Sequence, residues 1–420
     1  MSDHNVLVMD ANSQHTGGEP LKRALSLPLV VLYGIGVTVG AGIYVLIGVT
    51  AGKAGVYAPF AFLLAAIVVA LSAASFAEMA GRLPVSAGEA AYVQEGFRSK
   101  ALSLAVGLMV ITSAVVSSAA ISIGAMGYIL EFIGAPETLI VASVILVMGA
   151  VAAWGIMESV TFASLFTIIE VAGLLVIVAA GVIADPGLML RLGEIVPPAG
   201  EMAPWLAIYG SGLLAFFAFV GFEDIVNLAE ETREPRKTLP WAIFLTLILS
   251  TLIYVMVVTV AVLSVPIDQL AASRAPLGFV FNQITGLPSI AISAIAIVAT
   301  LNGVIVQIIM ASRVLYGLAR QESVPAIFGK VNPVTHTPLV ATGTVVGLIL
   351  VLALFFPLQH LAEMTSRVVL TIFALVNISL ILVKRRGTPA PEGAFTVRLW
   401  VPVLGFASCA FVLAGGFFGL

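Results

Sequence analysis

The sequence predicts an all-α protein that crosses a membrane many times. Of its 420 residues, 60% are hydrophobic and only 10% are charged, whereas a soluble domain carries about 25% charged residues. The mean hydropathy is +1.13, and apolar runs of membrane-spanning length recur along the whole chain. Lysine and arginine gather in alternate connections between these runs. Together these features indicate a polytopic membrane protein with about eleven spans.

Three regions follow from the hydropathy pattern. Residues 1–26 are polar and have no periodic apolar face, so we expect a disordered cytoplasmic tail. Residues 27–384 are predicted to form a ten-helix core, and residues 385–420 a cytoplasmic loop and an eleventh helix. The predicted spans are 27–51, 56–80, 102–131, 138–157, 162–184, 205–229, 240–265, 288–319, 338–357, 366–383 and 397–418.

The basic residues fix the expected orientation. If the N-terminus is cytoplasmic, all but four of the 19 lysine and arginine residues face the cytoplasm, as the positive-inside rule requires. The four on the outer side are Lys53, Arg191, Arg274 and Arg367. We therefore expect a multi-pass protein of the plasma membrane with a cytoplasmic N-terminus. One missed helix would scramble the alternation, so the same pattern supports the number of spans.

The sixth span carries polar residues that a plain spanning helix does not need. The stretch LLAFFAFVGFEDIVNLAEETREPRKTLP places Gly221, Glu223 and Asp224 at membrane depth. A carboxylate near the bilayer centre costs roughly 2.5–3.5 kcal/mol on insertion scales. That cost is tolerated where a helix is interrupted and its backbone lines a cavity. We therefore expect residues 217–223 to be the unwound middle of a broken helix, with a small-molecule site at the break.

The first span is rich in glycine, with four glycines from Gly34 to Gly42. Glycine lets the backbone leave helical geometry, but glycines four residues apart also allow close helix packing. Both interpretations stay open for Gly36 and Gly40, whereas for the Gly40-Ala41-Gly42 triplet we favour unwinding. Halves that begin at spans one and six have opposite orientations. Two interrupted helices in corresponding positions of inverted halves indicate a secondary transporter.

Four segments carry a resemblance to a known family. They are GIGVTVGAGIYVLIG in span one, FFAFVGFED in span six, the following AEETREPRKTLP, and ASRVLYGLARQESVPAIFGKVN at 311–332. Together they resemble the amino acid–polyamine–organocation superfamily, from about Lys22 to Trp400. The resemblance implies a leucine-transporter-type fold, a five-plus-five inverted repeat in which helices 1 and 6 are broken. It also implies secondary transport of amino acids, commonly by proton symport or exchange. Relatives usually have twelve spans, and we expect the ten-helix core to suffice for transport.

An amino acid presents a carboxylate and an ammonium group to such a site. A half-helix that begins near Gly42 would direct free N–H groups at the carboxylate, and the unwound sixth span would offer carbonyl oxygens to the ammonium group. By resemblance, the substrate-binding residues are Thr38, Gly40, Ala41 and Gly42 for the carboxylate, Phe217, Ala218 and Val220 for the ammonium group, and Gln307 for the side chain. Phe217 is expected to act as an aromatic gate, with ordinary packing as the alternative. Asn302 and Asn377 are interpreted as structural helix–helix hydrogen bonds.

Two carboxylates are candidates for proton coupling. Many proton-coupled relatives carry a lysine in the fifth span where this chain has Glu170, so the sign of the charge is reversed. Glu170 is therefore either a proton site or a neutral, hydrogen-bonded structural group. Glu223 follows directly on the break in span six, with helix capping as its alternative role. We expect H+ as the coupling ion, and sodium symport or exchange of amino acids or polyamines stays open.

A membrane receptor and an intramembrane enzyme are the other classes considered. The sequence contains no HExxH motif, no Gly-x-Ser-x-Gly motif and no paired histidine ligands. We therefore expect no enzymatic activity, no cofactor and no metal site. The expected partners are an amino acid, the coupling ion and the lipid bilayer, with no nucleic acid. The residues do not define which amino acid or amine is carried, or the oligomeric state.

Overall fold

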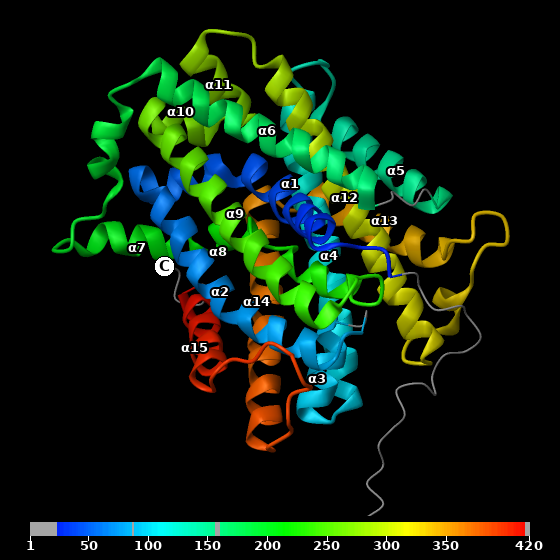
Figure 1. The fold of residues 1–420 in the computed structure, drawn as a ribbon. Coiled ribbons are helices and arrows are strands. Elements are labelled where there is room, and N and C mark those ends of the chain that lie inside the picture. Colours follow the sequence, from blue (N-terminus) through cyan, green and yellow to red (C-terminus); the bar gives the residue numbers. More distant parts are fainter. Residues whose placement is uncertain (1–22, 86–87, 156–159, 416–420) are drawn as a thin grey trace, which may run out of the picture.

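Helices occupy the positions of the eleven predicted spans (Figure 1). A computed structural model describes residues 23–85, 88–155 and 160–415, so residues 1–22 of the predicted tail lie outside the described residues. The helices at the predicted spans are α1 (Leu27–Ala54), α2 (Ala58–Arg82), α4 (Lys100–Ile129), α5 (Glu137–Trp154), α6 (Val160–Ala184), then α7 (Met202–Gly210), α8 (Gly212–Phe217) and η3 (Phe222–Leu228), then α9 (Pro235–Ser264), α12 (Ile290–Arg320), α13 (Leu339–Phe355), α14 (Leu358–Arg385) and α15 (Trp400–Gly415). The bent unit of α7, α8 and η3 is called span six below.

Shorter helices fill the connections between the spans. The short α-helices are α3 (Gly88–Phe97), α10 (Ile267–Ala272) and α11 (Pro276–Thr285), and the short 3-10 helices are η1 (Gly55–Tyr57), η2 (Leu188–Ile195) and η4 (Ala326–Gly329). Proline residues stand at the start of both α10 and α11, where the missing N–H costs no helical hydrogen bond. α3 lies at the bottom of Figure 1 beside α14.

Length and hydropathy agree with repeated membrane crossing. Among the described residues, seven helices are long and apolar enough to cross a membrane, or eight if Met202–Gly210 and Gly212–Leu228 form one span. This count treats Gly42–Arg82 as one stretch, although it holds parts of both α1 and α2. α13 and α15 are apolar but shorter. The prediction of an all-α polytopic membrane protein is confirmed.

Span six is interrupted where the sequence predicts a break. α8 ends at Phe217, residues 218–221 form turns, and η3 begins at Phe222 as a 3-10 helix. Gly221 stands in the left-handed region with φ +115°, and a Cβ atom there would lie 2.7 Å from Val37 Cγ1. Both facts require glycine at this position. A second bend of 41° separates α7 from the rest of span six.

Span one corrects the prediction, because α1 is helical without interruption from Leu27 to Ala54. The predicted unwinding at Gly40-Ala41-Gly42 is therefore wrong. The glycines serve close packing instead, which was the other interpretation of the pattern. A Cβ atom on Gly42 would lie 2.3 Å from Ala218 Cα, and one on Gly36 would collide with Thr167 Oγ1 on α6. The side chain of Ala41 lies outside the described part of the structure.

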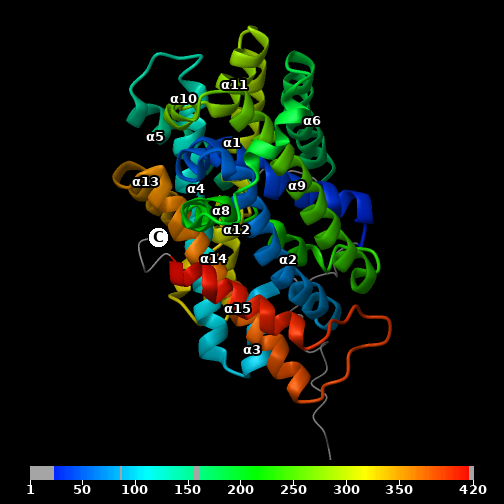
Figure 2. The same cartoon turned by 90° about the vertical axis from the view of Figure 1, so that its left-hand side faces the viewer.

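The two halves of the core make equivalent contacts. α1 packs against α6 and α9, and span six packs through α8 against the corresponding helices α14 and α2. α4 packs against α14, and its counterpart α12 packs against α6. Each of these contacts in one half has its counterpart in the other, as a five-plus-five arrangement requires. α15 lies outside this correspondence, beside α14 and α2 (Figure 2).

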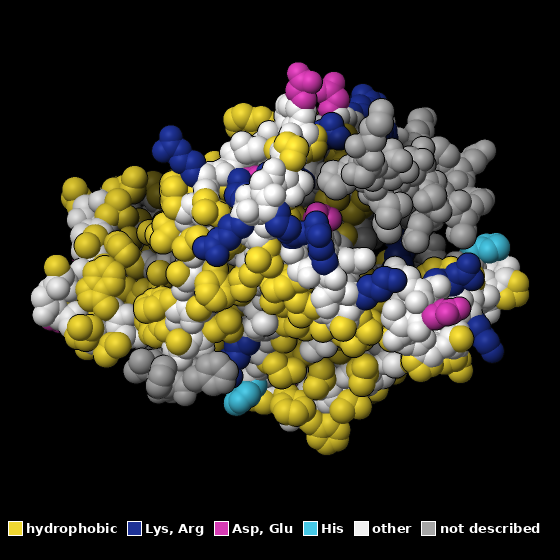
Figure 3. All heavy atoms as spheres, turned by 90° about the horizontal axis from the view of Figure 1, so that it is seen from below, with side chains coloured by type: hydrophobic (Ala, Val, Ile, Leu, Met, Phe, Trp, Pro, Cys, Tyr) yellow, Lys and Arg dark blue, Asp and Glu magenta, His cyan; other side chains and the backbone are white. Residues whose placement is uncertain are grey.

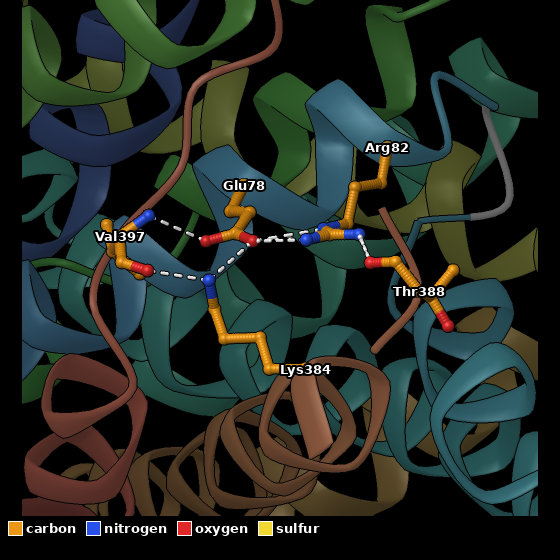
Figure 4. Close-up of polar contacts among 5 residues, drawn as sticks. All are labelled: Glu78, Arg82, Lys384, Thr388 and Val397. Carbon is orange, nitrogen blue, oxygen red and sulfur yellow. Dashed lines mark hydrogen bonds and ion pairs between the residues drawn. The ribbon is translucent and has the colours of Figure 1, made fainter. Parts of the chain in front are cut away.

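A buried ionic network ties α2 to the end of α14 and to the loop before α15. The Glu78 side chain is fully buried, and its Oε1 lies 2.8 Å from Arg82 Nη2 and 2.7 Å from Lys384 Nζ. Its other oxygen accepts a 2.7 Å hydrogen bond from the Val397 N–H. Arg82 and Lys384 also donate to the carbonyls of Thr388 and Val397 (Figure 4). One carboxylate thus organises the chain between α14 and α15.

A short backbone pairing joins the segment before α1 to the loop after span six. The Leu25 N–H donates to the Glu231 carbonyl at 3.0 Å, and the Arg233 N–H donates to the Leu25 carbonyl at 2.9 Å. These bonds form an isolated parallel bridge between Leu25 and Thr232, and both residues are buried. The last residues of the predicted tail are therefore anchored to the loop after span six.

Candidate functional site

A cavity lies against the break in span six, enclosed by α1, α4 and α12. The lining residues are Gly36, Val37, Gly42, Ser117, Ile121, Phe217, Val220, Asn302, Gly303, Val306 and Gln307. The side chains of these described residues are apolar or neutral and polar. The cavity therefore offers hydrogen-bonding groups within mostly apolar walls, as small-molecule sites commonly do.

Half of the predicted substrate-binding residues line this cavity. Gly42 lies on its α1 side, Phe217 and Val220 at the break, and Gln307 on α12. These four come from three elements far apart in the sequence, and the fold brings them together. The predicted pocket position of Gln307 and the placement of Phe217 at the break are both seen in this geometry.

Three more of the predicted residues stand beside the cavity rather than in its lining. Thr38 is 1% exposed, and its hydroxyl has no hydrogen-bond partner among the described residues. Gly40 faces α6 and α12, because a Cβ atom there would lie 3.3 Å from Glu170 Oε2 and 3.5 Å from the Ala299 carbonyl oxygen. Ala218 packs its Cα atom against Gly42. These residues shape the wall around the site.

The backbone at the break is less free than the sequence suggests. The Phe217 carbonyl accepts the Val220 N–H at 3.1 Å, and the Ala218 carbonyl accepts the Tyr254 hydroxyl at 2.7 Å. Each carbonyl oxygen has a second lone pair, so both can still accept from an ammonium group. In α1, the helical backbone N–H groups near Gly42 are not the free donors of a half-helix start.

Tyr254 of α9 is a site component that the sequence analysis missed. Its hydroxyl lies 2.7 Å from the carbonyl oxygens of both Thr38 and Ala218, and so joins α1 to span six next to the cavity. Its ring packs edge-on against Phe219 and Phe62. A tyrosine inside an apolar span carries no signal of such a role, because its contacts come from elements far away in the sequence.

Two further sets of lining residues were missed or interpreted differently. Ser117 and Ile121 are one turn apart on α4, and Gly303 and Val306 line the cavity beside Gln307 on α12. Helical spacing predicts Gly303, which precedes Gln307 by four residues, but not Val306. Asn302 was interpreted as structural but lines the cavity, and its Oδ1 has no partner among the described residues. Asn377, in contrast, bonds Ser75 and Ser72 across helices, as predicted.

Glu170 lies on α6 and faces α1. Its side chain is fully buried, with Oε2 beside Gly40. The Tyr44 hydroxyl of α1 donates to the Glu170 carbonyl oxygen at 2.8 Å, and Tyr44 is held in turn by Tyr128, whose hydroxyl donates to its carbonyl at 2.7 Å. The carboxyl group thus lies against α1, one of the helices that line the cavity.

A second cavity carries three carboxyl groups. Its lining comprises Glu89, Val110, Ser113, Glu223, Asp224, Met310, Val369, Ile372 and Phe373. On α4, Ser113 is one turn from Ser117 of the first cavity, and on α12, Met310 follows Gln307 by three residues. The two cavities are therefore stacked along the same helices. The second predicted proton site, Glu223, belongs here, and its Oε2 accepts the Gly221 N–H at 2.9 Å.

Comparisons with known proteins agree with this arrangement. A family model described as amino acid permease matches residues 25–420. The branched-chain amino acid permease BcaP of Bacillus subtilis is 26% identical over 92% of this chain and 86% of its own length. The vacuolar cationic amino acid transporter 2 of Arabidopsis thaliana is 27% identical over 90% of this chain, which spans 62% of that longer protein. The methylthioribose transporter of Bacillus subtilis is 25% identical over 96% of the chain. Because the family match covers nearly the whole sequence, the chain belongs to the amino acid permease family, within the superfamily that its motifs resemble.

Proposed function

We propose that this chain is a secondary active transporter that carries a neutral amino acid across the plasma membrane together with a proton. Membership of the permease family makes it a multi-pass membrane protein of amino acid transport and not an enzyme. Family membership does not define the coupling ion, the class of amino acid or the orientation in the membrane, and these are the parts that we propose.

The cavity at the break in span six carries this proposal. It is bounded by both first helices of the two halves and by α4 and α12, and a site at the interface of inverted halves is where alternating access needs it. Phe217 from the break and Gln307 from α12 both line the cavity. The carbonyl groups of Phe217 and Ala218 are available at the break as additional acceptors for a substrate ammonium group.

The lining favours a neutral side chain. Val37, Ile121 and Val306 supply apolar surface, and Ser117 and Asn302 supply neutral polar groups. A cationic side chain would lose its hydration here without a counter-charge, which costs far more than burying an apolar one. The Bacillus subtilis relative named as a branched-chain amino acid permease is consistent with this class of substrate.

Glu170 supports coupling to a proton. A carboxyl group that is completely buried beside Gly40 is costly to ionise unless its surroundings change. Substrate binding between α1 and span six acts on the same helix that contacts Glu170. Binding and protonation are then reciprocally linked, which is the thermodynamic requirement for symport.

Sodium coupling is the second candidate, because oxygen atoms from two other helices converge on α1. Glu170 Oε2 and the Ala299 carbonyl oxygen both lie close to the position that a Cβ atom on Gly40 would take. Carboxylate and carbonyl oxygens are the ligands that a hard cation prefers. A sodium ion at this position would replace the proton in the coupling scheme.

The expected orientation places the basic surface in the cytoplasm. Figure 3 views the molecule from below Figure 1 and displays many Lys and Arg side chains on that face. α3 and the end of α14, with Lys384 and Arg385 in its last turn, lie toward this side (Figure 1). This surface supports a cytoplasmic N-terminus through the positive-inside rule.

Uptake into proteoliposomes tests the proposal. Radiolabelled leucine and arginine are offered in parallel, with an imposed proton gradient, an imposed sodium gradient, or neither. We expect accumulation of leucine driven by the proton gradient and little competition by arginine. Accumulation that follows only the sodium gradient would show that sodium is the coupling ion. Preferential uptake of arginine would contradict a neutral substrate, and exchange without accumulation would contradict symport.

A further inference from the structure

The second cavity gathers three acidic side chains from two separate elements. Glu89 is contributed by α3, whereas Glu223 and Asp224 come from η3. Their exposed fractions are 5%, 9% and 4%. The remaining lining residues are apolar, apart from Ser113. Three carboxyl groups thus share one largely apolar enclosure, which we call the carboxyl cavity.

The charges of this cavity are not balanced by neighbouring cations. Its described lining contains no lysine, arginine or histidine. Glu223 has the Gly221 N–H as a partner, but Asp224 Oδ2 is buried, belongs to a residue that borders the cavity, and has no hydrogen-bond partner in the part of the chain that the structure describes. An ionised, unpartnered carboxylate in such surroundings is strongly disfavoured. Asp224 therefore requires a ligand that supplies positive charge.

The other titratable groups near the cavity do not supply this charge. On α3, Tyr92 interacts with Glu89, and on α1, Tyr33 interacts with Asp224, with Arg313 of α12 and with Glu231. Of these groups only Arg313 is basic, and its side chain is exposed and outside the lining. α2 and α14 present Phe76 and Phe373 to Phe222 of η3. The neighbouring helices therefore enclose the carboxyl groups without neutralising them.

A proton fits this site better than a metal ion. Hard metal ions take six or more oxygen ligands in proteins or retain their water. In the described ranges, no group of three acidic, histidine or cysteine side chains is placed to hold a metal. Carboxyl groups of like charge that share a site, in contrast, readily retain a proton between them. Burial raises the pKa of Glu89, which lies outside the spanning helices, to about 7.

We propose that Glu89, Glu223 and Asp224 form a proton-binding site in which Glu89 of α3 is an essential partner. This inference rests on the proposed proton-coupled transport and assigns a site that is separate from Glu170. The proton lies on a carboxyl oxygen and is shared within the cluster. When water enters the carboxyl cavity from the cytoplasmic side, the O–H bond breaks, the proton passes to that water, and the carboxylate remains hydrated.

The stacking of the two cavities gives the proton site its place in transport. Span six borders both cavities, through Phe217 and Val220 in one and Glu223 and Asp224 in the other. Movement of span six that opens a path for substrate toward the cytoplasm must also disturb the carboxyl cavity. Proton release and substrate release are thereby connected through one element.

Infrared titration tests the site without relying on transport. The carbonyl stretch of protonated carboxyl groups is followed in the purified full-length protein from about pH 5 to about pH 9, a range above the ordinary carboxyl pKa values of about 4 in which only groups with a raised pKa titrate. The variants are Glu89→Gln and Asp224→Asn, which keep the shape of the neutral acid. Glu95→Gln is the matched control, since Glu95 lies on the same helix α3 but outside the lining.

We expect a carboxyl band of the wild type and of Glu95→Gln to disappear with a midpoint near neutral pH. In Glu89→Gln and Asp224→Asn this band should be lost, or its midpoint should move by at least one unit, a tenfold change in proton affinity. Identical titrations in all four proteins would overturn the proposal. So would a midpoint that follows sodium concentration, because the ligand would then be the metal ion.

Proteoliposome uptake then separates this proposal from the proposed function. If accumulation depends on the proton gradient in the wild type and is lost in Glu89→Gln but not in Glu95→Gln, both proposals stand. If the infrared titration depends on Glu89 but accumulation by the wild type does not depend on the proton gradient, the proton-binding site is supported and proton symport is contradicted. Gradient-driven accumulation that survives unchanged in Glu89→Gln would contradict the essential role of Glu89.

Discussion

Replacing Gly42 with alanine is expected to push α1 away from the break in span six. The new Cβ atom would lie 2.3 Å from Ala218 Cα and 3.2 Å from its carbonyl carbon, whereas carbon atoms in contact prefer about 3.5–4.0 Å. The obstacle is backbone, which cannot turn aside as a flexible side chain can. The two segments must therefore separate by about 1 Å. Overpacking of this kind typically costs about 1–3 kcal/mol.

The same substitution should weaken substrate binding, because Gly42 and Phe217 line the cavity from the two segments that separate. If the full cost falls on the bound state, about 1–3 kcal/mol corresponds to roughly 5- to 150-fold weaker affinity. The assay is thermal unfolding in one detergent, combined with titration of the transported amino acid on the same preparation.

Gly347→Ala is the matched control for this experiment. Gly347 lies within α13, and a Cβ atom there would meet nothing within 4 Å. The same chemical change should therefore leave affinity unchanged and stabilise the helix by about 0.5–1 kcal/mol. The reasoning is refuted if Gly42→Ala retains both the unfolding temperature and the affinity of the wild type.

Three further predictions follow from the contacts described. Glu170→Gln should abolish accumulation driven by a proton gradient while leaving exchange measurable, because glutamine keeps the shape of the neutral acid but releases no proton; gradient-driven accumulation like that of the wild type would make Glu170 structural. Glu78→Gln should lower the free energy of unfolding by about 3–5 kcal/mol, since it leaves Arg82 and Lys384 without their buried partner. The control Glu234→Gln, in an exposed pair with Lys237, should cost no more than about 1 kcal/mol. Equal losses in a denaturant titration would contradict this. Tyr254→Phe removes the hydroxyl that lies 2.7 Å from the carbonyl oxygens of Thr38 and Ala218 and shares its one hydrogen between them. One such hydrogen bond is worth about 0.5–1.5 kcal/mol, so binding should weaken several-fold in a folded protein, and an unchanged dissociation constant would count against a positioning role.

The sequence predicted the spans well, because each is a long apolar run and basic residues gather in alternate connections. The break in span six was also predictable, since Gly221 and two carboxylates at membrane depth conflict with a plain helix. The error at span one has a definite cause. Glycine signals either an irregular backbone or close approach, and only the position of Ala218 against Gly42 shows that packing applies here.

The site could be predicted in part because the chain resembles a known family. Phe217 belongs to one of the quoted motifs, and Gln307 was assigned by resemblance from its place in span eight. Tyr254 and Ser117 act through contacts between distant segments, and nothing in their sequence neighbourhoods reports those contacts. α3 was missed because a short helix with polar residues resembles a loop in a hydropathy profile. Glu89 was missed with it, although it completes the carboxyl cavity.

The bridge between Leu25 and Thr232 determines how firmly the start of α1 is held against the loop after span six. Separating this end from the loop after span six requires the loss of two backbone hydrogen bonds, or about 1–3 kcal/mol at about 0.5–1.5 kcal/mol each. This contact would be broken for roughly 0.6–16% of the time, which overlaps the roughly 0.1–10% populations of minor states that ligands can select. It is strong enough to define a resting position and weak enough to release by thermal motion, so that the binding energy of a small solute can decide which position prevails.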